Sequence, residues 1–540
     1  MKSCMPLHSY FKSLFSRRRT QSALDQRRKQ WGCEILRTRN MEVISALHRM
    51  APGEGISIDD ETWQDLAMDD VFAKIDRTES MPGRQVLYLR LREYAGDAQI
   101  LAERARQHDV FRKNQELREM VQSHLARLDQ PDAAYLLPFL HTTFPSAPRF
   151  KWVLHLLAVM PVICLLLGLF LAPKFFLVGF AAVIINSMIY VSYGQRIVPY
   201  FTSFSQISSM LGVAERLSQL QDPHELPELQ HLRNALPAIR RVRKHLGWLV
   251  MDRTALHELV QALIGYLNIV FLFDIVIFLR SLRTLRQEQK NLIDITKTLG
   301  ALDATISVAS YIEGLAYYST PTFVADWQFK VVDLFHPLIE SPVGNTLSLD
   351  GRSAVITGPN MAGKTSFIRA VGISCVLAQT LNLCLSREAV FPQATVHSAI
   401  KREDKLLDGE SYFFSEIKRV LSFTSASEHK GIRVLLIDEI FRGTNTVERI
   451  ASSVAVLRYL AKNNLVFVTT HDIELQSMLT DCFGVFHFTD HVIDGKYGFD
   501  YALRSGAVRS RNAIRLLKLS GYPESITDEA EALAERLSAG

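Results

Sequence analysis

A glycine-rich segment of this 540-residue chain has the residue types and the spacing that bind phosphate. The segment reads GPNMAGKT from Gly358 to Thr365 and directly follows a short apolar stretch. Gly358 and Gly363 allow backbone torsions that turn successive N–H groups toward phosphate oxygens. Lys364 can reach the β- and γ-phosphates, and the hydroxyl of Thr365 can bind Mg²⁺. The pattern therefore predicts a strand, a loop and a helix that together bind ATP and Mg²⁺.

Acidic residues follow a second strand-like stretch. Val434–Ile437 is apolar throughout, which is typical of a parallel strand buried on both faces, and Asp438 and Glu439 come directly after it. We expect Asp438 to hold the hydration shell of Mg²⁺ and Glu439 to polarise the attacking water. A third such stretch, Leu465–Thr470, ends at His471, which can sense the γ-phosphate. Taken alone, a histidine at such a position is more often a capping or surface residue.

Four segments carry patterns more specific than a phosphate-binding loop. They are GPNMAGKTS in that loop, DKLLDGESYFFSE (Asp404–Glu416), DEIFRGTNT (Asp438–Thr446) and TTHD (Thr469–Asp472). The most distinctive residues are Asn360 and Met361 in the loop and Arg442-Gly443-Thr444 after the two acids. Together the segments resemble the MutS family of mismatch-repair ATPases, over roughly residues 336–540.

The resemblance implies hydrolysis of ATP to ADP and phosphate in a head-to-tail homodimer. It places Ser411 against the γ-phosphate held by the opposite subunit; the other interpretation of Ser411 is a helix N-cap. The residues expected in catalysis are Glu439, Lys364, His471 and, in trans, Ser411. Those expected to bind nucleotide are Gly358, Pro359, Asn360, Met361, Ala362, Gly363, Lys364, Thr365, Ser366 and His336. Those expected to bind Mg²⁺ are Thr365 and Asp438.

The elements around these motifs change in character near residue 336. Beyond it, short buried strands alternate with helices, which predicts an α/β P-loop ATPase domain of the ABC/MutS type, with a mostly parallel sheet and C-terminal dimerisation helices, over 336–540. Residues 41–150 and 197–335 read as helical. The stretch from Ile75 to Leu91 is similar to the start of the family's helical lever domain. We therefore expect one all-α lever-type domain, in two parts, before the ATPase.

Two apolar runs separate the helical parts, within residues 151–196. Trp152–Pro173 and Phe175–Gln195 contain no Asp, Glu, Lys or Arg, and each exceeds the roughly 18 residues that indicate a membrane span. They predict a transmembrane helical hairpin, and the basic residues at its two ends place both ends in the cytoplasm. The alternative is a buried hairpin in a soluble domain. A third run, Leu259–Phe273, is shorter and is expected to form a buried core helix. The alternative is a third membrane span, which would put the following domain on the other side of the membrane.

The charge is unevenly distributed. Residues 1–40 hold ten basic and two acidic residues, so this arm carries +8 and the remainder carries −3 of the net charge of +5. Such an arm can bind phosphates of nucleic acid or of anionic lipid; the alternative is a solvated terminus. The six cysteines form no CxxC pair, which argues against a disulfide framework or a zinc site and favours a reducing compartment.

These patterns predict a MutS-like ATPase at the cytoplasmic membrane, with its ATPase and helical domains on the cytoplasmic side. ATP binding and hydrolysis would be coupled to binding of DNA, with lipid contacts through 152–195. Mismatch-reading members of the family use a Phe-x-Glu motif near the start of the chain, whereas Phe414-Ser415-Glu416 is the only such motif here. Mismatch specificity is therefore not expected. The alternative function is a membrane-associated, ATP-driven switch that signals to a protein partner without DNA.

Overall fold

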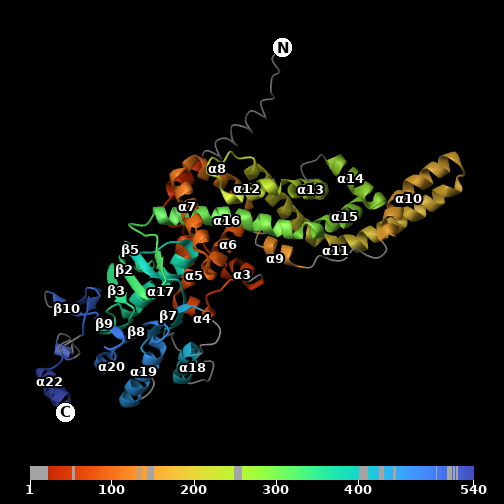
Figure 1. Ribbon diagram of the computed structural model, residues 1–540. Helices are drawn as coiled ribbons and strands as arrows, with labels where there is room; N and C mark the ends of the chain where they lie inside the picture. The colour runs from red at the N-terminus through yellow and green to blue at the C-terminus, as the bar shows by residue number, and fades with distance from the viewer. Residues whose placement is uncertain are drawn as a thin grey trace. The chain divides into compact units, whose positions relative to one another are not determined.

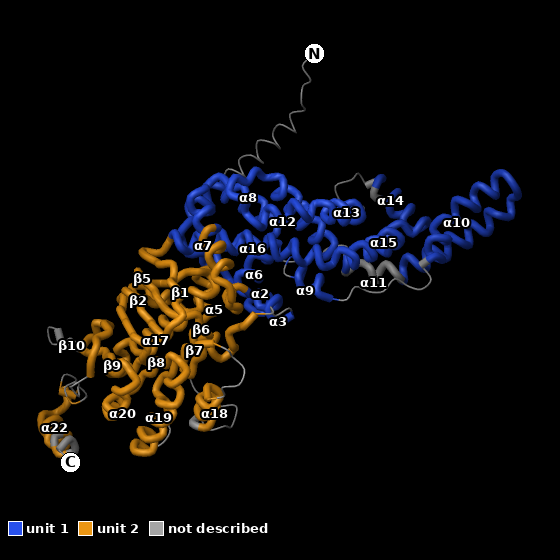
Figure 2. Tube along the Cα trace, viewed as in Figure 1, with its two compact units in different colours: residues 1–52, 76–89, 107–313 blue, residues 53–75, 90–106, 314–540 orange. Residues whose placement is uncertain are grey.

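The structure, a computed structural model, contains two compact units (Figure 2). It describes residues 22–50, 55–130, 133, 135–142, 151–247, 258–400, 412–424, 431–441, 445–493, 496–507, 514, 517–518 and 521–539. Unit 1 comprises residues 1–52, 76–89 and 107–313, and unit 2 comprises residues 53–75, 90–106 and 314–540. The units are not consecutive in sequence, so the linear domain division expected above differs from the compact units of the structure.

Unit 2 is built on a six-stranded sheet that carries the phosphate-binding loop. The strand order is β12-β9-β4-β8-β7-β6, and only β12 is antiparallel to its neighbour. In chain order the strands are β4 (Ser353–Thr357), β6 (Ala394–Ala399), β7 (Ile432–Asp438), β8 (Leu465–Thr470), β9 (Phe483–His487) and β12 (Arg504–Ser505). All residues of β4 and β8 are buried, as their apolar sequences require. The α/β fold with a mostly parallel sheet is thus confirmed for this unit.

Two smaller sheets accompany it. A mixed sheet has the order β1-β5-β2-β3, formed by Thr322–Val324, Glu388–Pro392, Gln328–Leu334 and Asn345–Asp350. Its first strand precedes residue 336, so the α/β unit begins earlier than the sequence patterns indicated. The strands β10 (Asp490–Ile493) and β11 (Lys496–Phe499) form a separate antiparallel pair.

Unit 2 also contains helices, several of which pack against its sheets. They are α17 (Lys364–Leu381), α18 (Tyr412–Thr424), α19 (Thr446–Ala461), α20 (Ile473–Met478) and α22 (Glu524–Ala539), with α4 (Asp60–Asp65) and α5 (Met68–Ile75) from the N-terminal part of the chain. The edge strand β6 meets α4, because the carboxylate of Asp65 accepts hydrogen bonds from Ser398 Oγ (2.7 Å) and Ile400 N (3.0 Å). Arg419 of α18 also donates to Asp59 (2.9 Å). These contacts explain why residues 53–75 belong to the α/β unit.

Unit 1 is helical and surrounds the long helix α16 (Gln289–Glu313), which is buried over most of its length. The other helices lying wholly in this unit are α2 (Met41–Ile44), α3 (Ala46–Met50), α8 (Gln115–Leu125), α9 (Leu136–His141), α10 (Lys151–Phe170), α11 (Lys174–Ser218), α12 (Pro227–Asn234), α13 (Leu236–Leu246), α14 (Glu258–Phe271) and α15 (Phe273–Gln287). Two more, α6 (Met81–Arg92) and α7 (Ala98–Lys113), contribute residues to both units. The apolar core includes Phe204, Leu211 and Leu299.

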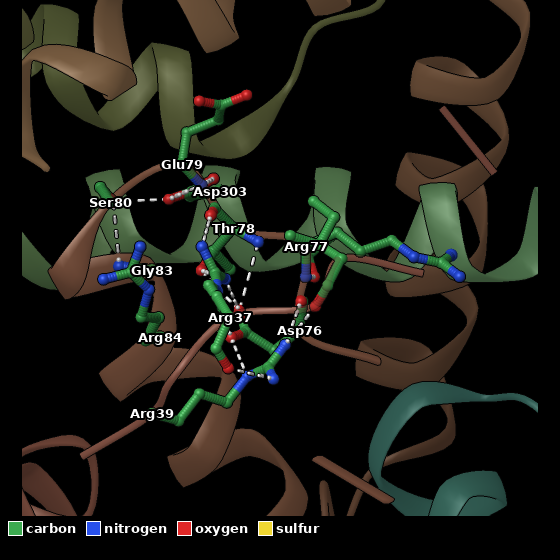
Figure 3. Close-up of polar contacts among 12 residues, drawn as sticks. Arg37, Arg39, Asp76, Arg77, Thr78, Glu79, Ser80, Gly83, Arg84 and Asp303 are labelled. Carbon is green, nitrogen blue, oxygen red and sulfur yellow. Dashed lines mark hydrogen bonds and ion pairs between the residues drawn. The ribbon is translucent and has the colours of Figure 1, made fainter. Parts of the chain in front are cut away.

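Buried carboxylates connect distant segments of this helical unit through ion pairs and hydrogen bonds (Figure 3). Asp76 is fully buried and forms ion pairs with Arg37 (2.5 Å) and Arg39 (2.9 Å). Asp303 of α16 accepts hydrogen bonds from Ser80 Oγ (2.5 Å) and from the backbone N–H of Glu79 (2.9 Å) at the start of α6. Burial raises the pKa of Asp303 to about 7, against the lowering effect of these hydrogen bonds. The arginines of the basic arm that lie nearest to residue 40 therefore have a structural role.

The apolar runs form a helical hairpin of α10 and α11 that extends beyond the other helices of unit 1 (Figure 1). Two helices of the described chain are long and apolar enough to cross a membrane, Trp152–Phe170 and Lys174–Ser192, with mean hydropathies of 2.6 and 2.1. Only 11% of each of these segments is buried. A bent pair, Ala262–Phe271 with Phe273–Gln287, meets the same criteria if counted as one span.

The expectation of a buried core helix over 259–273 is wrong for α14. Leu259 is 76% exposed and Tyr266 is 70% exposed, because this helix lies at the surface of unit 1. The neighbouring helix α15 does belong to the core, where Ile275, Phe278 and Leu282 are buried.

Candidate nucleotide-binding site

The phosphate-binding loop joins the central strand β4 to helix α17. Gly358 has φ 144° and Gly363 has φ 102°, a backbone region that side chains other than hydrogen disfavour. A Cβ on Gly358 would also lie 2.8 Å from the carbonyl oxygen of Phe488. Gly363 precedes α17, and no side chain caps this helix. The first N–H groups of a helix have no acceptor within the helix, and this end of a helix is a common binding site for anions.

Lys364 lies over this loop. Its Nζ donates to the carbonyl oxygens of Gly358 (2.8 Å) and Pro359 (2.9 Å). It also lies 3.5 Å from both ring nitrogens of His471. The ammonium group is thus held where phosphate oxygens would contact the loop.

Thr365 and Asp438 meet through the register of the sheet. Asp438 ends β7 beside Thr469 of β8, and Thr357 ends β4 beside Thr470, so the carboxyl ends of the three strands are adjacent. The hydroxyl of Thr365 donates to Asp438 Oδ2 (2.8 Å), and the hydroxyl of Thr469 donates to Asp438 Oδ1. The two residues expected to bind Mg²⁺ are therefore in direct contact.

This oxygen pair has the chemistry that Mg²⁺ requires. Mg²⁺ prefers hard oxygen ligands and is usually bound by one or two carboxylates together with substrate phosphates and water. Among the described residues, no group of three or more His, Cys, Asp and Glu side chains could form a metal site by itself. A hydroxyl and a carboxylate beside a phosphate-binding loop fit a metal that arrives with a nucleotide.

Glu439 and His471 also come together, from the ends of β7 and β8. His471 Nε2 lies 2.5 Å from Glu439 Oε1, and their side chains are 31% and 16% exposed. Glu439 has φ 55°, and its N–H donates to the carbonyl oxygen of Thr469 (3.1 Å). Glu439 also lines the cavity above the phosphate-binding loop. Beside His471, Asp472 is paired with Arg449 of α19 (2.8 Å).

A cavity of about 450 Å³ opens above the loop. It is lined by 18 residues, and those predicted from sequence are His336, Asn360, Met361, Gly363, Lys364, Thr365, Ser366 and Glu439. The imidazole of His336 accepts a hydrogen bond from the N–H of Leu338 (3.2 Å). Burial, and then the charge of Arg369, lowers the pKa of His336 to about 4, so this ring is neutral at pH 7. The volume is in the range of small-molecule sites.

Several lining residues carry no signal in the sequence. Pro342, Asn345, Phe488 and Tyr501 contribute to the cavity from loops and strand ends. Asn345 is held by two contacts with the backbone of 501–503, because its Nδ2 donates to Tyr501 O (3.1 Å) and its Oδ1 accepts from Leu503 N (2.7 Å). An aromatic after a strand is too common a pattern to identify such residues in advance.

Three predicted features lie wholly or partly outside the described residues. They are the segment 404–411 with Ser411, expected to act in trans, the Arg442-Gly443-Thr444 segment, and residues 1–21 of the basic arm. The remaining predicted nucleotide-binding residues, Pro359 and Ala362, lie in the loop with Gly358.

Comparison with known proteins points in the same direction. Residues 354–538 match the family model described as MutS domain V. The chain is 29% identical over 272 residues to the "DNA mismatch repair protein MutS" of Aquifex pyrophilus, which covers 47% of this chain and 31% of the relative. It is 29% identical over 255 residues to the "DNA mismatch repair protein MutS 2" of Halobacterium salinarum, covering 45% and 29%. It is 26% identical over 276 residues to the "DNA mismatch repair protein MSH3" of Phaeosphaeria nodorum, covering 48% and 24%. The chain thus spans about a third or less of the length of these relatives.

Proposed function

We propose that this chain is a MutS-family ATPase, anchored in a membrane, because residues 354–538 match MutS domain V and the relatives it resembles are MutS proteins. We propose further that it couples ATP binding and hydrolysis, in a head-to-tail dimer, to DNA binding. The observation that carries the ATPase assignment is the convergence of Thr365, Asp438 and Glu439 at the carboxyl ends of β4 and β7. Such an edge is where ligands bind in parallel α/β sheets.

The residues of the cavity divide the chemistry among them. The N–H groups at the start of α17 and the ammonium of Lys364 stabilise negative charge on the transferred phosphoryl group. Glu439, held by His471, orients the attacking water and accepts its proton. Thr365 and Asp438 would hold Mg²⁺, which when bound supplies charge neutralisation between the phosphates.

The membrane assignment depends on the α10–α11 hairpin. Its exposed side chains are mostly apolar, including Leu169 (64%), Leu177 (75%) and Phe180 (67%). Exposing such a surface to water is unfavourable, and each helix is long enough to span the hydrocarbon layer. We place the ATPase on the cytoplasmic side because Arg149, Lys151 and Arg196 flank the hairpin.

The DNA assignment comes from the relatives, whose names describe DNA mismatch repair proteins. It is tested with the purified full-length chain in detergent at low salt. We expect binding to duplex, mismatched or branched DNA that changes between ATP and ADP and weakens steeply as salt rises. Binding that is absent with every nucleotide would contradict this part of the proposal, and would favour an ATP-driven switch acting on a protein partner.

The dimer is tested by mixing two inactive variants. Lys364→Ala protein should lose nucleotide binding, and Ser411→Ala protein should bind ATP but hydrolyse it poorly. In a mixed dimer, the intact nucleotide site of the Ser411→Ala subunit faces the intact Ser411 of the Lys364→Ala subunit. Phosphate release should therefore recover in the mixture. If the mixture stays as inactive as its components, Ser411 does not act in trans.

A further inference from the structure

Helix α14 presents an exposed apolar face. Leu259, Leu263 and Tyr266 are 76%, 57% and 70% exposed. Val260 and Leu267 are also exposed, and the spacing of the five residues places them on one side of the helix. From 259 to 273 the chain contains no Asp, Glu, Lys or Arg. A continuous face of this kind requires an apolar environment.

The C-terminal end of α14 is bonded to the hairpin by an asparagine. Asn186 of α11 is fully buried, and its Nδ2 donates to the carbonyl oxygens of Leu157 in α10 (2.9 Å) and Val270 in α14 (2.6 Å). Val270 lies in the last turn of α14, where carbonyls have no partner within the helix. One amide therefore joins three helices, which is a typical role of polar side chains between membrane helices.

The chain turns sharply after α14. The axes of α14 and α15 differ by 70°, and Leu272 between them has φ 50° and is fully buried. The 14 residues of α14 span about 21 Å at 1.5 Å per residue, less than the roughly 30 Å of a hydrocarbon core. The pair can therefore enter a bilayer and return on the same side. Burial of the break in protein satisfies the requirement for non-helical backbone at membrane depth.

The outward face of α15 changes from apolar to cationic. Phe273 at its start is 40% exposed, and Arg280, Arg283 and Arg286 are exposed further along. On α13, Lys244 is exposed as well. Cations that follow an apolar segment within two or three helical turns are typical of the layer of lipid headgroups, where they attract anionic lipid.

We infer that α14 is a third membrane-embedded element, which enters only the cytoplasmic leaflet. Its exposed face contacts acyl chains beside the base of the hairpin, and the arginines of α15 contact anionic headgroups. This inference depends on the membrane hairpin proposed above. An anionic bilayer is favoured over a second copy of the chain because α14 is bonded to helices whose own exposed side chains are apolar, and because basic residues follow it.

The test uses the full-length protein in vesicles of phosphatidylglycerol and phosphatidylethanolamine. Cys4, Cys33 and Cys482 are replaced by serine, while the buried Cys164, Cys375 and Cys384 remain. A single environment-sensitive fluorophore is attached to Leu263→Cys in α14. The matched positions are Leu166→Cys in the hairpin (49% exposed) and Met120→Cys in α8 (37% exposed).

Quenching then locates each position. Brominated acyl chains should quench the fluorescence of the probes at 263 and 166, and iodide in the water should not. The probe at 120 should be quenched by iodide and not by the brominated acyl chains. If iodide quenches 263 while bromolipid quenches 166, the inference fails and the hairpin proposal stands. If iodide alone quenches both, the hairpin proposal fails too. If 263 is protected from both quenchers and crosslinks between copies, a second copy covers α14 and the inference is wrong.

Discussion

Carboxylates occupy both the cavity of unit 2 and the helical core of unit 1, but their surroundings differ. Glu439 and its partner His471 are 16% and 31% exposed and line or border open hollows. Asp76 and Asp303 are almost completely buried and are surrounded by donors from distant parts of the chain. Glu439 and His471 can form new hydrogen bonds with a ligand that enters the cavity. Asp76 and Asp303 cannot do so unless the helical core unfolds around them. The comparison separates residues that we propose to perform chemistry from residues that stabilise structure.

The largest expected effect is on the cavity side. Replacing Glu439 by Gln removes the proposed proton acceptor while keeping the shape of the side chain, so ATP turnover should fall by about 10² to 10⁴-fold, with ATP still bound. The measurement is steady-state phosphate release together with nucleotide affinity. The control is Glu388→Gln, an exposed carboxylate of the same unit paired with Lys330. Turnover at the wild-type rate in Glu439→Gln would show that another group activates the water.

A second effect belongs to the buried core. Asp76→Asn leaves Arg37 and Arg39 without their counter-charge, and should reduce the free energy of unfolding by about 3 kcal/mol. ATP turnover per folded molecule should not change. Urea unfolding in detergent measures the loss, against Asp129→Asn, which breaks a half-exposed ion pair with Arg84 and should cost less than about 1 kcal/mol. An equal loss of unfolding free energy in the two variants would show that the buried carboxylate contributes no more to stability than the half-exposed one.

A third effect depends on pH. Burial raises the pKa of Asp303 to about 7, well above the value of about 4 for an exposed aspartate. Between these values the folded protein keeps a proton that the unfolded chain releases, so stability that is present at low pH is lost as pH rises through about 7. The unfolding temperature of the wild type should therefore fall more between pH 5 and 8 than that of Asp303→Asn. Asp294→Asn, on the same helix, should keep the wild-type slope.

The smallest effect concerns His336. Because burial and Arg369 lower its pKa to about 4, the ring stays neutral above about pH 5. The ratio of ATP dissociation constants between His336→Gln and the wild type should therefore be constant from pH 5.5 to 8. A change in this ratio centred near pH 6.5 would show that the imidazole titrates as an exposed histidine does.

Many residues that line or border the cavity could be predicted because they lie in short sequence segments with recognisable patterns. Gly358 to Thr365 is local, and parallel strands bring Asp438, Glu439 and His471 to the same edge of the sheet whatever the loops between them do. Tyr501 and Asn345 were not predictable, because they are 156 positions apart in the sequence and no pattern between them fixes their contact.

Long-range packing was also beyond the sequence patterns. The basic arm indicated phosphate binding or a solvated terminus. In the structure, however, Arg37 and Arg39 neutralise the buried carboxylate of Asp76, and no local sequence pattern indicates that Asp76 is buried. Likewise the sequence of α4 indicates a short helix of a helical domain. In the structure, Asp65 of this helix accepts a hydrogen bond from Ser398 in the edge strand β6. Burial of α14 was wrongly expected because an apolar run suits a protein core and a lipid environment equally well.

The unbroken length of α11 has a mechanical consequence. Its 45 residues extend about 67 Å, from the tip of the hairpin to the core positions Leu211 and Leu217. The helix continues through Pro199, which has no N–H and so removes one hydrogen bond from the interior of the helix. The proposed anchor would therefore be a rod with one weak point and not a flexible tether. A protein on a flexible tether can adopt many orientations relative to its membrane. A protein joined to its membrane segment by a continuous helix is restricted to a narrow range of tilt angles. In that arrangement the bilayer would fix the direction in which the helical unit faces the cytoplasm.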